Sequence, residues 1–171
     1  MSAIGMFIGS TTGKTESVAE LIQAEFGGED VVKIHDISDC DASDLQGYEK
    51  LILGCPTWNI GDLQSDWEEF YEGDLEEVDF NGKKVAYFGT GDQCDYPDNF
   101  QDAIGILEEK VTAQGGTTVG LWPNEGYDFN ESRGFRDGVW LGLAIDEDNQ
   151  PELTEGRVKA WVTKLKSELG L

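Results

Sequence analysis

The chain has 171 residues, 39% of them hydrophobic, and its 35 acidic against 12 basic residues give a formal net charge of −23. This length supports one full-sized core rather than two, so we expect a single domain over residues 1–171. An aromatic content of 11% argues against a disordered acidic chain. The negative charge disfavours nucleic acid and anionic membranes and favours partners with basic surfaces.

The cysteine count and the N-terminal sequence bear on where the protein works. The sequence has no run of about 18 apolar residues, and MSAIGMFIG has neither a basic flank nor a small-residue cleavage site. Three cysteines without C-x-x-C spacing accompany a single histidine, which argues against disulfides and against a metal site. We therefore expect a soluble cytoplasmic protein without membrane insertion, in which Cys55 is a buried thiol.

Apolar runs alternate with helical patterns from one end of the chain to the other. The predicted strands are residues 3–8, 31–34, 50–54, 83–89 and 117–122. Their apolar character is typical of strands buried on both faces. Five such strands separated by helices predict an α/β fold, in which helices cover both faces of a parallel sheet. Binding sites in this architecture lie at the carboxyl ends of the strands.

Two helices are well defined by their apolar spacing. The stripe of the first consists of Val18, Leu21, Ile22 and Phe26. Gly27 and Gly28 follow it and predict its end. The stripe of the last consists of Val158, Trp161, Val162, Leu165 and Leu169. Thr154 is its predicted N-cap.

Residues 123–138, PNEGYDFNESRGFRDG, break this rhythm. They are polar and glycine-rich, have neither a helical nor a strand period, and precede another apolar run at residues 139–145. We interpret them as an insertion that interrupts or follows the fifth strand, not as a second domain.

The first candidate site is the loop after the first strand, within GSTTGKTESVAEL at residues 9–21. It resembles an ATP-binding loop, but only three residues separate Gly9 from Gly13 where that motif needs four. Gly13 allows close approach of the backbone, and the following helix directs its free amides and positive dipole end at a ligand. The loop hydroxyls belong to Ser10, Thr11, Thr12 and Thr15, and Lys14 is its one base. The loop therefore predicts a phosphate site, the alternative being an ordinary capped turn.

The second candidate is the loop after the third strand, formed by Pro56, Thr57, Trp58, Asn59, Ile60 and Gly61. A tryptophan at a loop tip is costly to expose unless a flat group covers it. The alternative is that Trp58 packs on a helix beginning near Gln64.

The third candidate is the loop after the fourth strand, which begins with Thr90, Gly91, Asp92 and Gln93 and continues to Tyr96. It offers a second aromatic ring and several backbone amides, although it is equally compatible with a solvent-exposed turn. Because neighbouring parallel strands end at one edge of the sheet, we expect the three loops to share a crevice. A ligand with a phosphate at one end and a flat ring at the other fits this arrangement.

These three loops, FIGSTTGKTESVAELI, PTWNIG and TGDQCDYPDNF, resemble those of the long-chain flavodoxins, small electron carriers that hold flavin mononucleotide (FMN). The resemblance covers essentially the whole chain. The first loop has the family's T-x-T-G-x-T form, with serine in the first place. The resemblance implies a three-layer α/β/α sandwich with strand order 2-1-3-4-5, the order that flavodoxin itself exemplifies.

The resemblance also implies the roles of the loop residues. Residues 10–15 would bind the FMN phosphate, and Trp58 and Tyr96 would sandwich the isoalloxazine ring. Backbone groups of residues 57–61 and 90–93 would bond the ribityl chain and the polar ring edge, with Pro56 at the start of the second loop. No residue has a catalytic role, because a carrier needs no general acid or base. His35, the one histidine, is expected to be structural.

Redox behaviour follows from the same resemblance. The carrier would work at low potential with tightly but non-covalently bound FMN, mainly between semiquinone and hydroquinone. The peptide between Asn59 and Ile60 would flip on reduction, and asparagine tolerates the flipped geometry less well than the glycine of many relatives. We therefore expect a less stabilised semiquinone.

Acidic residues follow the second loop without a base among them. They are Asp62, Asp66, Glu68, Glu69, Glu72, Asp74, Glu76, Glu77 and Asp79. Although many belong on a solvated helix face, the segment starts beside the proposed ring. Its field should disfavour added negative charge and so lower the second reduction potential.

The resemblance suggests basic redox partners such as ferredoxin-NADP reductase and, in photosynthetic organisms, photosystem I, with the carrier a monomer. Three other functions compete with this one. An FMN-dependent quinone or nitro reductase would need an open ring face and a nicotinamide site. An interaction module would keep the fold without flavin. A nucleotidase or kinase is disfavoured, because the first loop lacks the glycine spacing of an ATP-binding loop.

Overall fold

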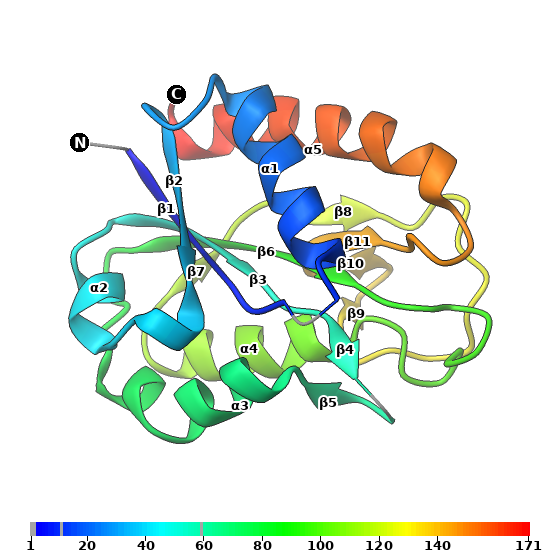
Figure 1. The fold of residues 1–171 in the computed structure, drawn as a ribbon, viewed down its shortest axis with the longest axis horizontal. Helices are drawn as coiled ribbons and strands as arrows, with labels where there is room; N and C mark the ends of the chain where they lie inside the picture. The colour runs from blue at the N-terminus through cyan, green and yellow to red at the C-terminus, as the bar shows by residue number, and fades with distance from the viewer. Residues whose placement is uncertain (1–2, 11, 59) are drawn as a thin grey trace.

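A parallel sheet forms the centre of the computed structural model, which describes residues 3–10, 12–58 and 60–171 (Figure 1). Its strands are β1 (Ile4–Ile8), β2 (Val32–Asp36), β3 (Lys50–Gly54), β6 (Lys84–Thr90) and β11 (Leu143–Ile145). They lie in the order β2-β1-β3-β6-β11, and every pairing is parallel. The expected order 2-1-3-4-5 is confirmed, with β11 in the fifth place.

Helices cover both faces of this sheet. Helices α1 (Lys14–Phe26) and α5 (Thr154–Leu169) lie on one face, and α3 (Ser65–Glu72) and α4 (Asp102–Ala113) lie on the other (Figure 1). The short α2 (Ala42–Gln46) joins β2 to β3 after the 3-10 turn η1 (Ile37–Asp39). The three-layer arrangement is therefore confirmed.

The apolar strand runs serve two cores because successive side chains of a strand point to opposite faces. Met6 packs in the core under α1 and α5, whereas its neighbour Phe7 packs in the core under α3 and α4. Ile52 and Leu53 divide between the two cores in the same way. Burial on both faces explains why these strands lack an alternating polar pattern.

The fifth strand differs from the prediction. Residues 117–122 do not form one strand: β7 (Thr117–Thr118) pairs with the start of β6, and β11 pairs with its end. Gly120 takes a φ of 75° and turns the chain away from the sheet, and its carbonyl accepts a bond of 2.8 Å from the indole of Trp161. The insertion thus interrupts the fifth strand, and the apolar run of residues 139–145 completes it.

The insertion forms a small antiparallel sheet beside the main one. Its strands are β8 (Trp122–Pro123), β10 (Val139–Trp140) and β9 (Phe135–Arg136), in that order. The buried ring of Trp140 lies at the centre of an aromatic cluster with Phe100, Tyr127, Phe129 and Phe135. This cluster lies apart from the two cores that flank the main sheet.

Helix boundaries agree with the sequence at one helix and not at the other. Gly27 and Gly28 end α1 with φ angles of 118° and 104°, as predicted. Thr154, the predicted N-cap, instead has helical angles and is the first residue of α5. The 3-10 turn η3 (Pro151–Leu153) runs directly into α5, so the helical path begins earlier than the cap pattern indicated.

Candidate functional site

A hollow of about 180 Å³ lies where the loops leave the carboxyl ends of β1, β3 and β6. It is lined by Thr12, Lys14, Pro56, Thr57, Trp58, Thr90, Gly91, Asp92, Tyr96, Glu147 and Asp148. All three predicted loops contribute to it. The expectation that they share one crevice is confirmed, and a fourth segment joins them.

The first loop ends at the N-terminus of α1. Gly13 is the N-cap with a φ of 86°, and no described side chain caps the helix. A Cβ atom added at Gly13 would meet no described atom within 4 Å, so the positive φ, rather than crowding within the protein, favours glycine here. The first-turn amides of α1 therefore remain available to an anion.

The hydroxyls of this loop are divided between the hollow and the protein. Thr12 lines the hollow. Ser10 Oγ accepts a bond of 3.1 Å from the Gly13 amide, and the buried Thr15 Oγ1 lies 3.0 Å from Thr90 Oγ1. Thr11 lies outside the described residues. The hydroxyls of Ser10 and Thr15 therefore also hold the loop in place, and their binding of a phosphate stays a prediction.

The second loop is the turn of a small hairpin. Strand β4 (Thr57–Trp58) pairs with β5 (Asp62–Leu63), and Thr57 Oγ1 accepts a bond of 3.0 Å from the Ala103 amide of α4. Trp58 is half-buried and lines the hollow, so its ring does not belong to the core under α3. Asn59 lies outside the described residues, and Ile60 is 78% exposed.

Gly61 has a structural reason to be glycine. Its φ is 86°, and a Cβ atom there would lie 2.6 Å from Asp102 Oδ2. Gln64 accepts bonds from the amides of Asp66 and Trp67, which confirms that α3 begins at this point. The hairpin is therefore fixed at both ends by helices on the same face of the sheet.

The third loop places Tyr96 on the wall of the hollow with 45% of its surface exposed. Several of its backbone amides were expected to be free, but most of them donate hydrogen bonds within the protein. The amides of Cys94 and Asp95 donate to Asp92 Oδ1, and the Tyr96 amide donates to the Asp92 carbonyl. Gly91 N donates to the carbonyl of Ile145. The loop is thus internally bonded, and it presents side chains more than free amides.

Gln93, whose backbone was expected to contact the cofactor, is used for contacts within the protein. It is 2% exposed and does not line the hollow. Its amide and its Nε2 both donate to Asp146 Oδ2, and its Oε1 accepts from the Asp128 amide of the insertion. Gln93 therefore joins the third loop to two other segments.

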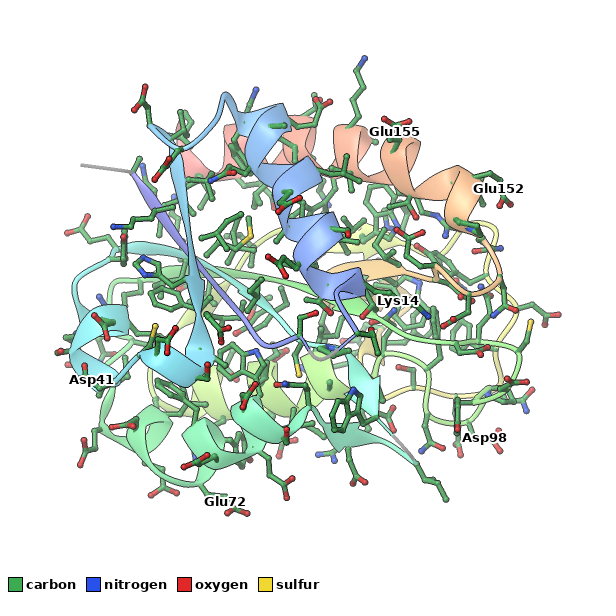
Figure 2. The ribbon with its side chains drawn as sticks, in the orientation of Figure 1. Lys14, Asp41, Glu72, Asp98, Glu152 and Glu155 are labelled. Atoms are coloured by element: carbon green, nitrogen blue, oxygen red, sulfur yellow. The ribbon has the colours of Figure 1, made fainter. Side chains whose placement is uncertain are left out.

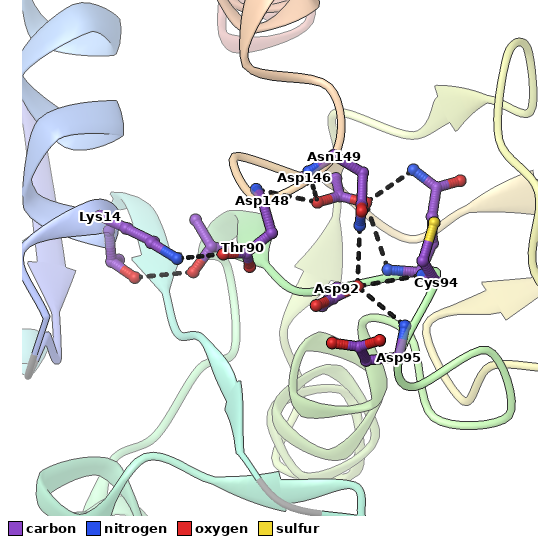
Figure 3. A network of polar contacts seen from close by, with 10 residues as sticks. Lys14, Thr90, Asp92, Cys94, Asp95, Asp146, Asp148 and Asn149 are labelled. Atoms are coloured by element: carbon purple, nitrogen blue, oxygen red, sulfur yellow. Dashed lines mark hydrogen bonds and ion pairs between the residues drawn. The ribbon is translucent and has the colours of Figure 1, made fainter.

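The fourth segment, residues 146–149, was missed by the sequence analysis. Its Asp148 forms an ion pair with Lys14, and both side chains are partly exposed (Figure 3). Asn149 Nδ2 donates to Asp92 Oδ1 at 2.8 Å and to Asp146 Oδ2 at 2.9 Å. Its place in the chain could have predicted this, because residues that follow the fifth strand of a parallel sheet reach the same edge as the other loops.

Acids at this edge influence one another. Repulsion from Asp92 is the main cause that raises the pKa of Asp95. For Asp92 itself, burial acts to raise the pKa, but hydrogen bonds from the Asp95 amide and from Asn149 outweigh it and leave the pKa lowered. Burial and four nearby carboxylates raise the pKa of the Cys94 thiol. The hollow therefore lies in a negative field.

The acids of residues 62–79 start at β5, which pairs with the strand that carries Trp58, and most of them are exposed, as expected for a solvated helix face. The described residues that line the hollow include none of these acids, and α3 carries the chain away from it (Figure 1). Asp74 and Glu77 lie beside α2, and Asp79 bonds with Gln46 there. Acidic side chains project outward around the molecule (Figure 2). The negative charge nearest the hollow comes instead from Asp92, Glu147 and Asp148.

His35 has the structural role expected for it. Its ring stacks on Phe7 at a centroid distance of 4.7 Å, and Nε2 lies 3.0 Å from the hydroxyl of Tyr48. Burial, followed by the charge of Lys33, lowers its pKa. Cys55 is fully buried as predicted, and burial raises its pKa to about 12.

Comparison with known proteins decides the family. The family model described as Flavodoxin matches residues 6–161. The chain is 63% identical to the flavodoxin of Synechococcus elongatus over 171 residues, which covers all of both chains. The chain belongs to the flavodoxin family. This family consists of FMN-containing electron carriers rather than enzymes, which decides against the reductase, nucleotidase and kinase alternatives.

Two further relatives agree with this assignment. The flavodoxin of a Nostoc species is 64% identical over 168 residues, with 98% of each chain covered. The crystal structure of Fusobacterium nucleatum flavodoxin bound to flavin mononucleotide superposes with a TM-score of 0.91 at 33% identity, covering 98% of this chain and 99% of the other. Within the part of the chain that the structure describes, no helix is long and apolar enough to cross a membrane.

Proposed function

We propose that this chain binds FMN non-covalently in the hollow and carries single electrons at low potential, mainly between the semiquinone and hydroquinone forms. The observation that carries the proposal is the meeting of a helix N-terminus that no described side chain caps with two partly exposed aromatic rings, Trp58 and Tyr96, at one edge of the sheet. The helix N-terminus fits a phosphate, and the pair of aromatic side chains fits a flat ring.

The residues present fit the cofactor in their chemistry. The amides of Lys14 and Thr15 and the loop hydroxyls, with that of Thr12 on the wall of the hollow, would hold the phosphate, while Trp58 and Tyr96 would cover the ring. FMN supplies the one-electron redox chemistry when bound.

The low potential would come from charge and burial acting together. Asp92, Glu147 and Asp148 oppose further negative charge in the hollow, and the aromatic rings exclude water that would otherwise solvate it. The same acidic edge would be complementary to basic redox proteins such as ferredoxin-NADP reductase and, in a photosynthetic host, photosystem I. The peptide between Asn59 and Ile60 remains our proposal for the group that flips on reduction, and replacing Asn59 with Gly should raise the first potential.

A reductive titration of the purified protein, followed by its absorbance, tests this function. The expected result is a yellow protein that passes through a neutral radical form, with two well separated potentials. Direct two-electron reduction by NAD(P)H would instead contradict the carrier function. Colourless protein that takes up no FMN would contradict the cofactor and support an interaction module.

A further inference from the structure

The carboxylate of Asp146 is fully buried and surrounded by hydrogen-bond donors. Its Oδ1 accepts from the amides of Asp148 at 3.1 Å and Asn149 at 2.9 Å. Its Oδ2 accepts from the Gln93 amide at 3.2 Å, from Gln93 Nε2 at 2.7 Å and from Asn149 Nδ2 at 2.9 Å (Figure 3). These five bonds come from two segments, so the side chain joins them.

The two oxygens of Asp146 have different structural consequences. The bonds to Oδ1 are local and close the turn that follows β11. Two of the three bonds to Oδ2 come from Gln93, which is 53 residues away in the third loop. The second set reaches the loop that carries Tyr96 directly, whereas the first set reaches it only through the position of Asn149.

A continuous set of bonds leads from Asp146 to Tyr96. Asn149 Nδ2 lies between the carboxylates of Asp146 and Asp92 and donates to both. Asp92 then accepts from the Cys94 and Asp95 amides through its side chain and from the Tyr96 amide through its carbonyl. The loop is therefore held at Gln93 and at Asp92.

We infer that Asp146 is a positioning residue for the flavin ring: acting through Gln93 and Asn149, it fixes the loop that sets Tyr96 on the wall of the hollow. The inference rests on the proposed function, in which Tyr96 covers the ring. It leaves the phosphate end to the first loop, where the Gly13–Ser10 and Thr15–Thr90 bonds do not involve Asp146. The one link between that loop and Asp146 is the partly exposed ion pair of Lys14 with Asp148, whose amide donates to Asp146 Oδ1.

The chemistry of the surrounding donors requires a carboxylate at this position. An isosteric amide has one acceptor oxygen, and its NH₂ group would face N–H donors on one side. A buried donor that loses its acceptor carries the full cost of its desolvation. Asp146→Asn therefore keeps the shape of the side chain but loses the hydrogen bonds that one of the two carboxylate oxygens accepts.

The experiment compares the full-length wild type with Asp146→Asn and Asn149→Ala, and uses Glu152→Gln as the control. The control removes one negative charge from an exposed residue of η3, outside this network. Riboflavin and inorganic phosphate are titrated separately into each apoprotein, because the first reports on the ring end and the second on the phosphate end. Visible circular dichroism of the FMN-saturated proteins reports the environment of the ring.

We expect Asp146→Asn to weaken riboflavin binding by at least about tenfold, to change phosphate binding by less than about twofold, and to alter the visible dichroism. Asn149→Ala, a change at an exposed side chain, should act in the same direction with a smaller loss. The control should match the wild type. Equal riboflavin binding by wild type and Asp146→Asn, or parallel losses of riboflavin and phosphate binding, would overturn the inference.

Amide hydrogen exchange separates this inference from the proposed function. Without any flavin, Asp146→Asn should speed exchange at Gln93, Cys94 and Asp95, because their amides lose or loosen their acceptors. Unchanged exchange would contradict the anchoring of the loop. A wild type that binds no flavin, with faster exchange in the variant, would contradict only the proposed function.

Discussion

The side-chain hydroxyls of Thr15 and Thr90 lie 3.0 Å apart in the buried interior, although 75 residues separate them in the chain. One residue belongs to the first turn of α1, and the other ends β6. The bond therefore joins the first loop of the hollow directly to the third.

Replacing either threonine with valine should lower the free energy of unfolding by about 1–2 kcal/mol, because the remaining hydroxyl is buried without this partner. The double variant should lose less than the sum of the two, because no unpaired hydroxyl remains. Urea denaturation of the four proteins measures this coupling. Strictly additive losses would show that the two hydroxyls do not stabilise each other.

Substitution of Gly13 should cause loss of FMN, whereas substitution of Lys14 should not. Lys14 pairs with Asp148 at a partly exposed position, so Lys14→Ala should leave FMN bound, with its affinity reduced by less than about tenfold. Gly13→Ala places a side chain at a φ of 86°, which costs about 1 kcal/mol and disturbs the helix start that faces the phosphate. FMN affinities from fluorescence titration check both. Loss of FMN from Lys14→Ala, with retention in Gly13→Ala, would reopen the ATP-loop interpretation.

The potential of the second one-electron reduction should depend on where a charge is removed. Glu147→Gln, on the wall of the hollow, should raise it by about 15–60 mV, the range expected for one carboxylate at roughly 12 Å from the added charge with an effective dielectric constant of about 20 to 80. Glu77→Gln is the matched control, since Glu77 lies beside α2 at the far end of the acidic segment.

Spectroelectrochemistry at low and high salt measures both variants. The difference between them should shrink as salt is added, because ions screen exposed charges. The wild-type potential itself should rise with salt. A larger shift for Glu77→Gln, or a salt-independent potential, would remove the electrostatic explanation.

The insertion should depend on Arg136 for its attachment to α4. Arg136 Nη1 lies 3.0 Å from Glu108 Oε2, and the Glu108 side chain is only 4% exposed. Arg136→Ala leaves this buried carboxylate without its cation, so the free energy of unfolding should fall by about 1–3 kcal/mol, less than for a fully buried pair because the arginine is half exposed. Arg133→Ala is the control, since its pair with Glu109 is exposed on both sides and should contribute less than about 1 kcal/mol. Equal effects in chemical denaturation would contradict the anchoring role of Arg136.

His35 should make stability pH-dependent just below neutrality. Burial lowers the pKa of His35 in the folded protein below the ordinary value of 6.5, so the unfolded chain binds the proton more readily. The contribution of His35 to stability is therefore present above pH 6.5 and is lost as the pH falls from there towards the folded pKa. Relative to His35→Gln, the wild type should lose unfolding free energy between pH 7.5 and 5.5. A constant difference between the two proteins across this range would contradict the shift.

The sequence by itself determined the fold class, the strand order through the family resemblance, and the three loops that meet at the hollow. These features depend on local patterns: apolar runs such as that of β3, the glycines that end α1, and the spacing around Gly13. Such patterns are visible in sequence because each follows from backbone geometry and side-chain periodicity.

Only the tertiary structure decided which groups face the hollow. It buried Thr15 and Gln93, occupied the amides of Gly91 and of residues 93–96, and brought residues 146–149 to the site after the insertion had divided the fifth strand. It also moved the acids beyond α3 away from the hollow, because a helix carries charge along its axis at 1.5 Å per residue. The burial of Thr15 and Gln93 and the position of residues 146–149 depend on contacts between segments far apart in the chain, and no local pattern records those contacts.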